Sequence, residues 1–86
     1  MQIRFTDRFA EDYESLPSDL QDRVDKALLL FQANPRHPSL HVRKMKGHRN
    51  IWEARVTQGY RFTFSIDKAG VYILRRVGPH EIEKVP

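Results

Sequence analysis

Two arginines and a glutamate in the second half of the chain have the residue types and spacing to act on a phosphate. Glu53 and Arg55 alternate with apolar residues in "IWEARV", and Arg61 does so in "GYRFTFSI". If these segments form a hairpin, both guanidinium groups can lie on its polar face, where two planar donor groups suit one phosphate. The alternative is a solvated sheet surface on which Glu53 pairs weakly with an arginine.

A histidine near the end of the sequence could supply a proton. His80 follows Val77-Gly78-Pro79, a pattern that predicts the end of a strand and a turn. Its imidazole would then lie at the edge of the sheet, with Arg75 or Arg76 behind it. A histidine can donate a proton near neutral pH, so general acid catalysis is one interpretation and a solvated surface turn is the other.

The sequence lacks the motifs of nucleotide-dependent and zinc-dependent enzymes. It has no glycine-rich phosphate loop, no nucleophile elbow and no HExxH pair. It has no cysteine, and the spacing of its four histidines (His37, His41, His48 and His80) matches no recognised ligand pattern. We therefore expect neither a metal site nor a small-molecule cofactor.

The charge is distributed unevenly along the chain. Residues 1–34 contain four basic and seven acidic residues, a net of −3, and residues 35–86 contain eleven basic and four acidic residues, a net of +7. So basic a second half indicates an anionic partner such as RNA, DNA or an acidic protein. A solvated basic surface is the alternative.

The elements that must position these side chains begin with a short strand and two helices. Alternation over 1–5 predicts a strand that buries Ile3 and Phe5, and Thr6 is placed to cap a helix of two to three turns. A second helix follows Pro17 and ends at Asn34-Pro35. Its apolar stripe consists of Leu20, Val24, Ala27, Leu28 and Phe31.

Strands make up the rest of the chain. We expect an extended segment before Gly47, a hairpin over 51–66 that turns at Gln58-Gly59, and a further strand at 71–77. Together they predict an antiparallel arrangement. The expected fold class is α+β, with an N-terminal strand and a two-helix hairpin packed on a twisted, mainly antiparallel sheet of four to five strands. The helices would cover one face of the sheet and leave the other, polar face open.

Length and composition predict a single domain over 1–86, because so short a chain cannot sustain two cores. The absence of cysteine fits a reducing compartment. No apolar stretch reaches the roughly 20 residues of a membrane span, and acidic residues interrupt the start of the chain. We expect a cytoplasmic protein with no membrane partner.

Four segments after the helical opening, in this order, carry a resemblance to a known family: "KMKG" (44–47), "IWEARV" (51–56), "GYRFTF" (59–64) and "RRVGPHEI" (75–82). From about residue 3 to residue 83 the chain resembles the RelE/ParE superfamily of toxins of type II toxin-antitoxin systems. The resemblance to RelE implies a ribosome-dependent mRNA endonuclease, acting on mRNA in the ribosomal A site and neutralised by a cognate antitoxin protein. A ParE-like inhibitor of DNA gyrase, or a weak or inactive relative that only binds its antitoxin, is the alternative.

The resemblance to RelE also implies roles for individual residues in metal-independent cleavage, which gives a 2′,3′-cyclic phosphate and a 5′-hydroxyl. Arg61 and Arg55 would stabilise the phosphate and His80 would be the general acid. Glu53 is the candidate general base, with Lys46 or His41 as alternatives. The residues expected to contact RNA are Lys44, Lys46, Arg43, Arg49 and Arg76. Unlike RelE-type nucleases, this chain has no aromatic residue after His80 on which a base could stack.

Overall fold

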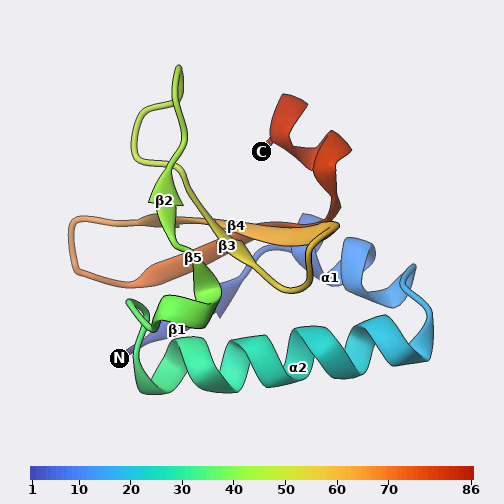
Figure 1. Cartoon of the computed structure of the whole chain (residues 1–86). Coiled ribbons are helices and arrows are strands. Elements are labelled where there is room, and N and C mark those ends of the chain that lie inside the picture. Colours follow the sequence, from blue (N-terminus) through green and yellow to red (C-terminus); the bar gives the residue numbers. More distant parts are fainter.

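The computed structural model describes the whole chain, residues 1–86, as one five-stranded sheet with two helices packed against it (Figure 1). In chain order the elements are β1 (Ile3–Phe5), α1 (Asp7–Glu14), α2 (Ser18–Ala33), the 3-10 turn η1 (Pro38–Leu40), β2 (Arg43–Lys44), β3 (Trp52–Arg55), β4 (Tyr60–Ile66), β5 (Tyr72–Pro79) and the 3-10 helix η2 (His80–Lys84). This confirms the α+β class predicted from the sequence. Neither helix has the length and hydropathy that crossing a membrane requires.

Both helices begin and end where the sequence predicts. The hydroxyl oxygen of Thr6 accepts a hydrogen bond from the backbone N–H of Phe9 at 3.1 Å, which caps α1. Helix α2 ends at Ala33, and Asn34 is extended because the proline after it disfavours helical backbone. The buried residues of α2 are Val24, Ala27 and Phe31, three members of the predicted stripe.

The sheet has the strand order β1-β5-β4-β3-β2, and only the β1–β5 pair is parallel. In the hairpin of β3 and β4, Arg55 lies opposite Arg61 and Glu53 lies opposite Thr63. Strand β2 adds Arg43 opposite Glu53. This register places Arg43, Glu53 and Arg61 on neighbouring strands.

The core lies between α2 and the sheet. Phe31 of α2 is fully buried, and its ring meets those of Phe62, Phe64 and Tyr72 edge-on at centroid distances of 4.9 to 5.5 Å. Edge-to-face aromatic pairs of this kind add about 0.5–1.5 kcal/mol each beyond the area they bury. The helix side of the hairpin is therefore a rigid base for the polar side chains on its other face.

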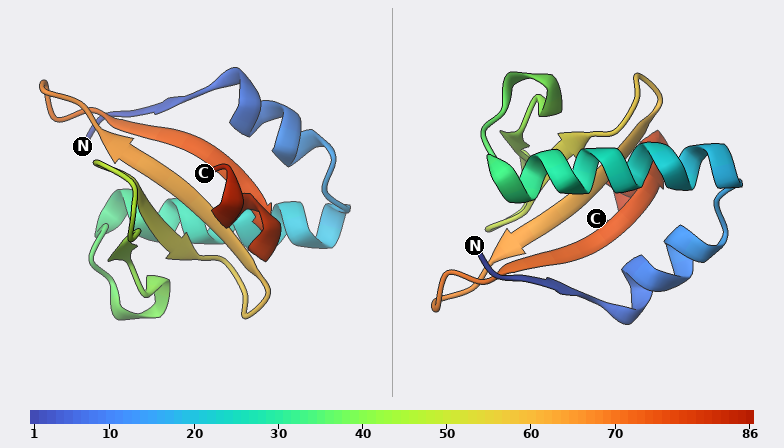
Figure 2. Two further views of the ribbon diagram at one scale, coloured as in Figure 1. Left: turned by 90° about the horizontal axis from the view of Figure 1, so that it is seen from above. Right: turned by 90° about the horizontal axis from the view of Figure 1, so that it is seen from below.

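The expectation of an open polar face was wrong. Helix η2 folds back over the sheet on the side opposite α2, as Figures 1 and 2 show. Ile82 of η2 is buried, and the hydroxyl of Thr63, itself without exposed surface, donates to the carbonyl oxygen of Pro86 at 3.0 Å. A five-residue 3-10 helix has no apolar periodicity that would reveal it in a sequence.

Two smaller expectations also need correction. Phe5 is about half exposed rather than buried, because β1 is an edge strand only three residues long and Phe5 lies at its end. Strand β2 covers only Arg43 and Lys44, and the chain leaves the sheet in a turn where Gly47 has a positive φ of 79°. The residues between β2 and β3 therefore form a projecting loop (Figure 1).

Candidate active site

A polar cavity of about 260 Å³ on the η2 side of the sheet brings together most of the residues predicted for catalysis. It is lined by His41, Arg43, Glu53, Arg55 and Arg61, and no apolar side chain contributes to it. Glu53 and Arg55 belong to β3, Arg61 belongs to β4, Arg43 belongs to β2, and His41 comes just before β2. The strand register described above places them side by side. The predicted grouping of Glu53, Arg55 and Arg61 is thus present in the structure.

Glu53 is the unusual member of this group, because its side chain is only 4% exposed. Its Oε1 accepts a hydrogen bond from Nε of Arg43 at 2.5 Å and lies 4.0 Å from Nε of Arg61. Burial, together with the adjacent carboxyl group of Glu83, raises the pKa of Glu53 against the opposing effect of Arg43. The sequence placed Glu53 on a solvated face, and the structure places it inside the protein.

Glu83 of η2 is a member of the site that the sequence did not predict. Its Oε2 lies 3.6 Å from Nε of Arg61 and 3.9 Å from Nη2 of Arg43, and its Oε1 lies 3.6 Å from Nδ1 of His80. The adjacent carboxyl group of Glu53 is the largest of the effects that lower the pKa of Glu83. The i,i+3 spacing of His80 and Glu83 is the only sequence signal that could have connected Glu83 to the site.

The buried side-chain polar atoms that lack a hydrogen-bond partner all belong to this site. They are Oε2 of Glu53, Nε of Arg55, Nε of Arg61 and Oε2 of Glu83. Buried polar groups are nearly always paired, and two donors and two acceptors left unpaired together indicate a place where a polar ligand binds. Such a ligand would need both hydrogen-bond acceptors and a donor.

His80 lies at the start of η2, and its side chain is 59% exposed. Its charged neighbour is Glu83, whereas the two arginines expected behind it are engaged elsewhere. Nε of Arg75 donates to the carbonyl of Pro86 at 3.2 Å, and Nε of Arg76 pairs with Oδ2 of Asp12 at 2.7 Å. Arg76 is thus held by Asp12 of helix α1, and its assignment to RNA binding stays a prediction.

The other predicted RNA contacts lie on the projecting arm formed by β2 and the loop to β3. Lys44, Lys46 and Arg49 are exposed, and the Arg43 side chain is 70% exposed although its Nε reaches into the site. The arm rises from the sheet on the same side as η2 (Figure 1). It can therefore present positive charge to a strand entering the polar cavity.

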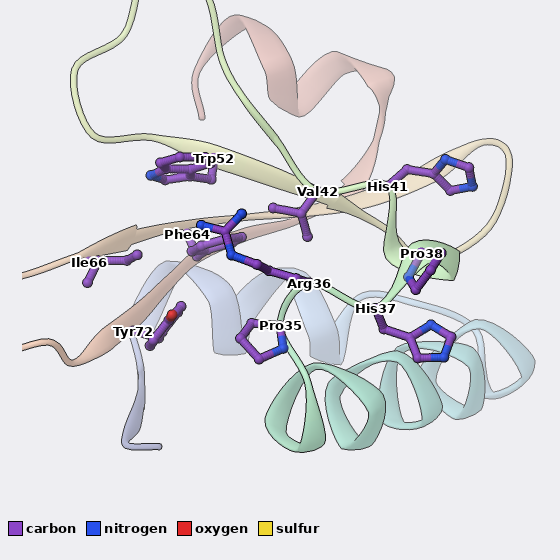
Figure 3. A pocket seen from close by; sticks show the side chains of 10 residues that line it. All are labelled: Pro35, Arg36, His37, Pro38, His41, Val42, Trp52, Phe64, Ile66 and Tyr72. Carbon is purple, nitrogen blue, oxygen red and sulfur yellow. The ribbon is translucent and has the colours of Figure 1, made fainter.

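A second cavity, of about 280 Å³, lies on the helix side of the sheet (Figure 3). Trp52, Phe64 and Tyr72 line it, and the ring of Trp52 stacks on that of Phe64 at 6.4 Å. Trp52 therefore lies on the face of the sheet opposite the polar cavity. The polar cavity is the better candidate site, because the second cavity contains none of the unpaired buried atoms.

The family model described as "ParE toxin of type II toxin-antitoxin system, parDE" matches residues 3–83, nearly the whole chain. The chain belongs to the ParE toxin family. It is thus a toxin of the RelE/ParE superfamily, as its sequence motifs indicated. No curated protein sequence matches this ParE-family chain.

Solved structures share the fold of this ParE-family toxin. The YoeB/ParE toxin from Agrobacterium tumefaciens is 16% identical with a TM-score of 0.76, over 93% of this chain and 99% of that one. A chain of the RelB-RelE antitoxin-toxin complex from Methanococcus jannaschii is 22% identical with a TM-score of 0.73, over 90% of this chain and 89% of that one. The intact E. coli RelBE toxin-antitoxin complex matches at 20% identity and a TM-score of 0.70, over 91% and 94%. At such identities the likeness concerns the fold alone.

Proposed function

We propose that this toxin cleaves mRNA in the ribosomal A site and that its polar cavity holds the phosphate at the cut. The set of unpaired buried atoms carries the proposal. A ribose-phosphate unit offers phosphoryl oxygens to the donors of Arg55 and Arg61 and a 2′-hydroxyl proton to a carboxylate oxygen. The proposed reaction uses side chains alone, with no metal ion and no small-molecule cofactor.

In the proposed reaction the 2′-oxygen attacks the adjacent phosphorus, and the bond from phosphorus to the 5′-oxygen of the next nucleotide breaks. A general base takes the 2′-hydroxyl proton, and a general acid gives a proton to the departing 5′-oxygen. The products are a 2′,3′-cyclic phosphate and a 5′-hydroxyl. Arg55 and Arg61 stabilise the negative charge that builds on the phosphoryl oxygens, in a site partly shielded from water.

Glu53 is the best-supported general base. One of its oxygens is held by Arg43, and the other is buried and unpaired, free to accept the 2′-hydroxyl proton. A raised pKa also makes its carboxylate a stronger base than an exposed glutamate. His41 lines the same cavity and remains an alternative, whereas Lys46 lies on the exposed arm.

His80 is the proposed general acid, since it is the imidazole on the same helix as Glu83 and faces solvent at the rim of the arginine cluster. Lys44, Lys46, Arg43 and Arg49 are proposed to hold the RNA backbone along the arm, and Arg76 is proposed as a further contact. Contacts of this kind with phosphates give affinity without sequence preference.

The proposal is tested by mRNA cleavage in a translating extract, mapped by primer extension. His80→Ala should lower the cleavage rate by about a hundredfold or more, the usual contribution of a general acid. His37→Ala is the matched control, because His37 pairs with Ser39 next to η1, outside the polar cavity. Cleavage at the wild-type rate by His80→Ala would overturn the assignment of the acid.

Inhibition of DNA gyrase is the second candidate, favoured by the family model, which is described as a ParE toxin. Both candidates predict growth arrest, so growth alone does not separate them. Gyrase-dependent DNA breakage with intact mRNA in arrested cells would support inhibition of gyrase. Arrest by Arg61→Ala at the wild-type level would likewise argue against phosphate chemistry.

We also propose that a cognate antitoxin protein binds this chain. Two of the structures that share its fold are described as a RelB-RelE antitoxin-toxin complex from Methanococcus jannaschii and a RelE-RelB complex from Pyrococcus horikoshii. Acidic segments of an antitoxin would suit the basic half of the chain, and apolar segments would suit the exposed Phe5 and Leu29 near the helices. Coexpression with the antitoxin should restore growth and give a complex that copurifies.

A further inference from the structure

We propose that the segment His80–Pro86 is an internal plug, in which the Glu83 carboxylate occupies the place that the substrate phosphate takes. The inference rests on the proposed function, because it concerns the same phosphate site. In the closed state seen here the toxin binds its own carboxylate, and RNA enters only when Glu83 leaves. The plug thus makes substrate binding a competition within the chain.

Apart from the adjacent carboxyl group of Glu53, the charged groups around Glu83 are those expected around a bound anion. Its two oxygens face Arg61 and Arg43 on one side and His80 on the other, at 3.6 to 3.9 Å. Carboxylate and phosphate both present oxygen acceptors and negative charge to a guanidinium group. The Glu83 carboxylate lies between Arg61 and His80, so a phosphate in contact with both residues would occupy the same position.

The distances show that Glu83 is a loose occupant. None of its three ion pairs is within the 3.5 Å of a hydrogen bond, and both Oε2 of Glu83 and Nε of Arg61 are buried without a partner. A phosphoryl oxygen that approached Nε of Arg61 to about 2.8 Å would satisfy a donor that Glu83 leaves unpaired. The site is therefore filled by a ligand weaker than the one it can hold.

The segment that carries Glu83 is attached to the sheet on both sides of this residue. Ile82, one residue before it, is buried against Gly78 of β5. After it, the carbonyl oxygen of Pro86 accepts hydrogen bonds from Thr63 and Arg75, and that of Val85 accepts one from Arg76. These attachments hold the carboxylate at the site, which raises its local concentration and makes even a weak contact compete with free phosphate.

Inorganic phosphate is the probe for the test, with its affinity for the full chain measured by NMR titration. Glu83→Gln removes the competing charge, whereas Glu81→Gln makes the same charge change on an exposed residue of the same helix. We expect Glu83→Gln to bind phosphate at least about fivefold more tightly than the wild type, and Glu81→Gln to stay within about twofold. Equal affinities of the two variants would overturn the plug, since only the overall charge would then matter.

A second measurement is made on the wild type, so its main result does not depend on whether a variant folds. Phosphate should displace Glu83, so the side-chain carboxyl ¹³C resonance of Glu83 should shift on titration while that of Glu81 stays fixed. A Glu83 resonance that does not move at saturating phosphate would overturn the plug. Arg61→Ala should abolish the shift, because the phosphate site itself is then lost.

The failure of this inference and the failure of the proposed function give different results. If the wild type cleaves mRNA and Glu83→Gln binds phosphate no better than the wild type, the plug is wrong and the proposed function stands. If Glu83→Gln binds phosphate more tightly and neither protein cleaves mRNA, the plug stands and the proposed function is wrong.

Discussion

Gly78 and Ile82 are packed so closely that a Cβ atom at position 78 would lie 2.9 Å from Cγ2 of Ile82. A contact that short forces something to move, so glycine is the residue that lets Ile82 settle against β5. Ile82 is next to Glu83, and it is the buried residue of η2. The space left by one missing methyl group on β5 therefore determines where the Glu83 carboxylate lies.

Gly78→Ala should displace η2 and destabilise the protein by about 1–3 kcal/mol, the usual cost of overpacking. Urea unfolding measures the loss, and hydrogen exchange at the amides of residues 82–85 locates it. Gly59→Ala is the control, because a Cβ atom there would meet nothing within 4 Å and its φ is not positive. Unchanged exchange in Gly78→Ala would show that η2 does not depend on this contact.

Asp12→Ala should destabilise the protein by about 2 kcal/mol, through loss of hydrogen bonds to a charged group. Asp12 of α1 accepts from Nε of Arg76 at 2.7 Å and from the backbone N–H of Val77 at 3.1 Å, and so joins α1 to β5. Thermal or urea unfolding measures the change. Glu11→Ala, a neighbouring exposed acid of the same helix, should alter stability by less than about 0.5 kcal/mol. Equal effects of the two variants would contradict the structural role of Asp12.

The stability of the fold should depend on the ionisation of Glu53. Burial, then the adjacent carboxyl group of Glu83, raises the pKa of Glu53 above the ordinary value of 4.5. Its proton therefore contributes stability that is full below pH 4.5 and is lost as the pH rises through the folded pKa. Glu53→Gln keeps a neutral group, so the stability of this variant relative to the wild type should increase as the pH is raised from about 4 toward 7.

Urea unfolding of the wild type, Glu53→Gln and Glu81→Gln across that pH range makes the comparison. Glu81 is exposed, so the stability difference between Glu81→Gln and the wild type should change little with pH. A difference for Glu53→Gln that stays constant, or that falls as the pH rises, would contradict a raised pKa in the folded state.

The parts of the fold that could be predicted from the sequence are those with a periodic pattern. Val24, Ala27 and Phe31 are spaced to form one face of a helix, and strict alternation set the register that places Arg55 opposite Arg61. Alternation also predicted strand β1, but three residues cannot show whether they pair parallel to β5 or elsewhere.

The site was only partly predictable for a related reason. A charged residue that alternates with apolar ones in a strand normally faces water, so Glu53 was assigned to a solvated face. Its burial depends on η2, which is held by one apolar side chain and a few hydrogen bonds to backbone carbonyls. Contacts of that kind depend on the three-dimensional path of the chain and leave no pattern in the sequence.

The basic arm should control how RNA binding depends on salt. Lys44 and Lys46 are exposed on the arm, which rises from the sheet on the same side as η2 (Figure 1), and each would release counterions from one phosphate of a bound strand. Replacing both with alanine should reduce the slope of log K against log salt by about 1.4, since each contact with single-stranded RNA contributes about 0.7. Fluorescence anisotropy of an uncleavable 2′-O-methyl oligoribonucleotide at several salt concentrations gives the slope.

The control for this prediction replaces two lysines away from the arm, Lys26 on α2 and Lys68 in the turn before β5. The double variants carry the same net charge, so long-range attraction changes in both. Only the arm variant should lose direct phosphate contacts. Equal slopes in the two variants would mean that RNA responds to the overall charge of the protein, and that the arm does not guide the strand toward Arg55 and Arg61.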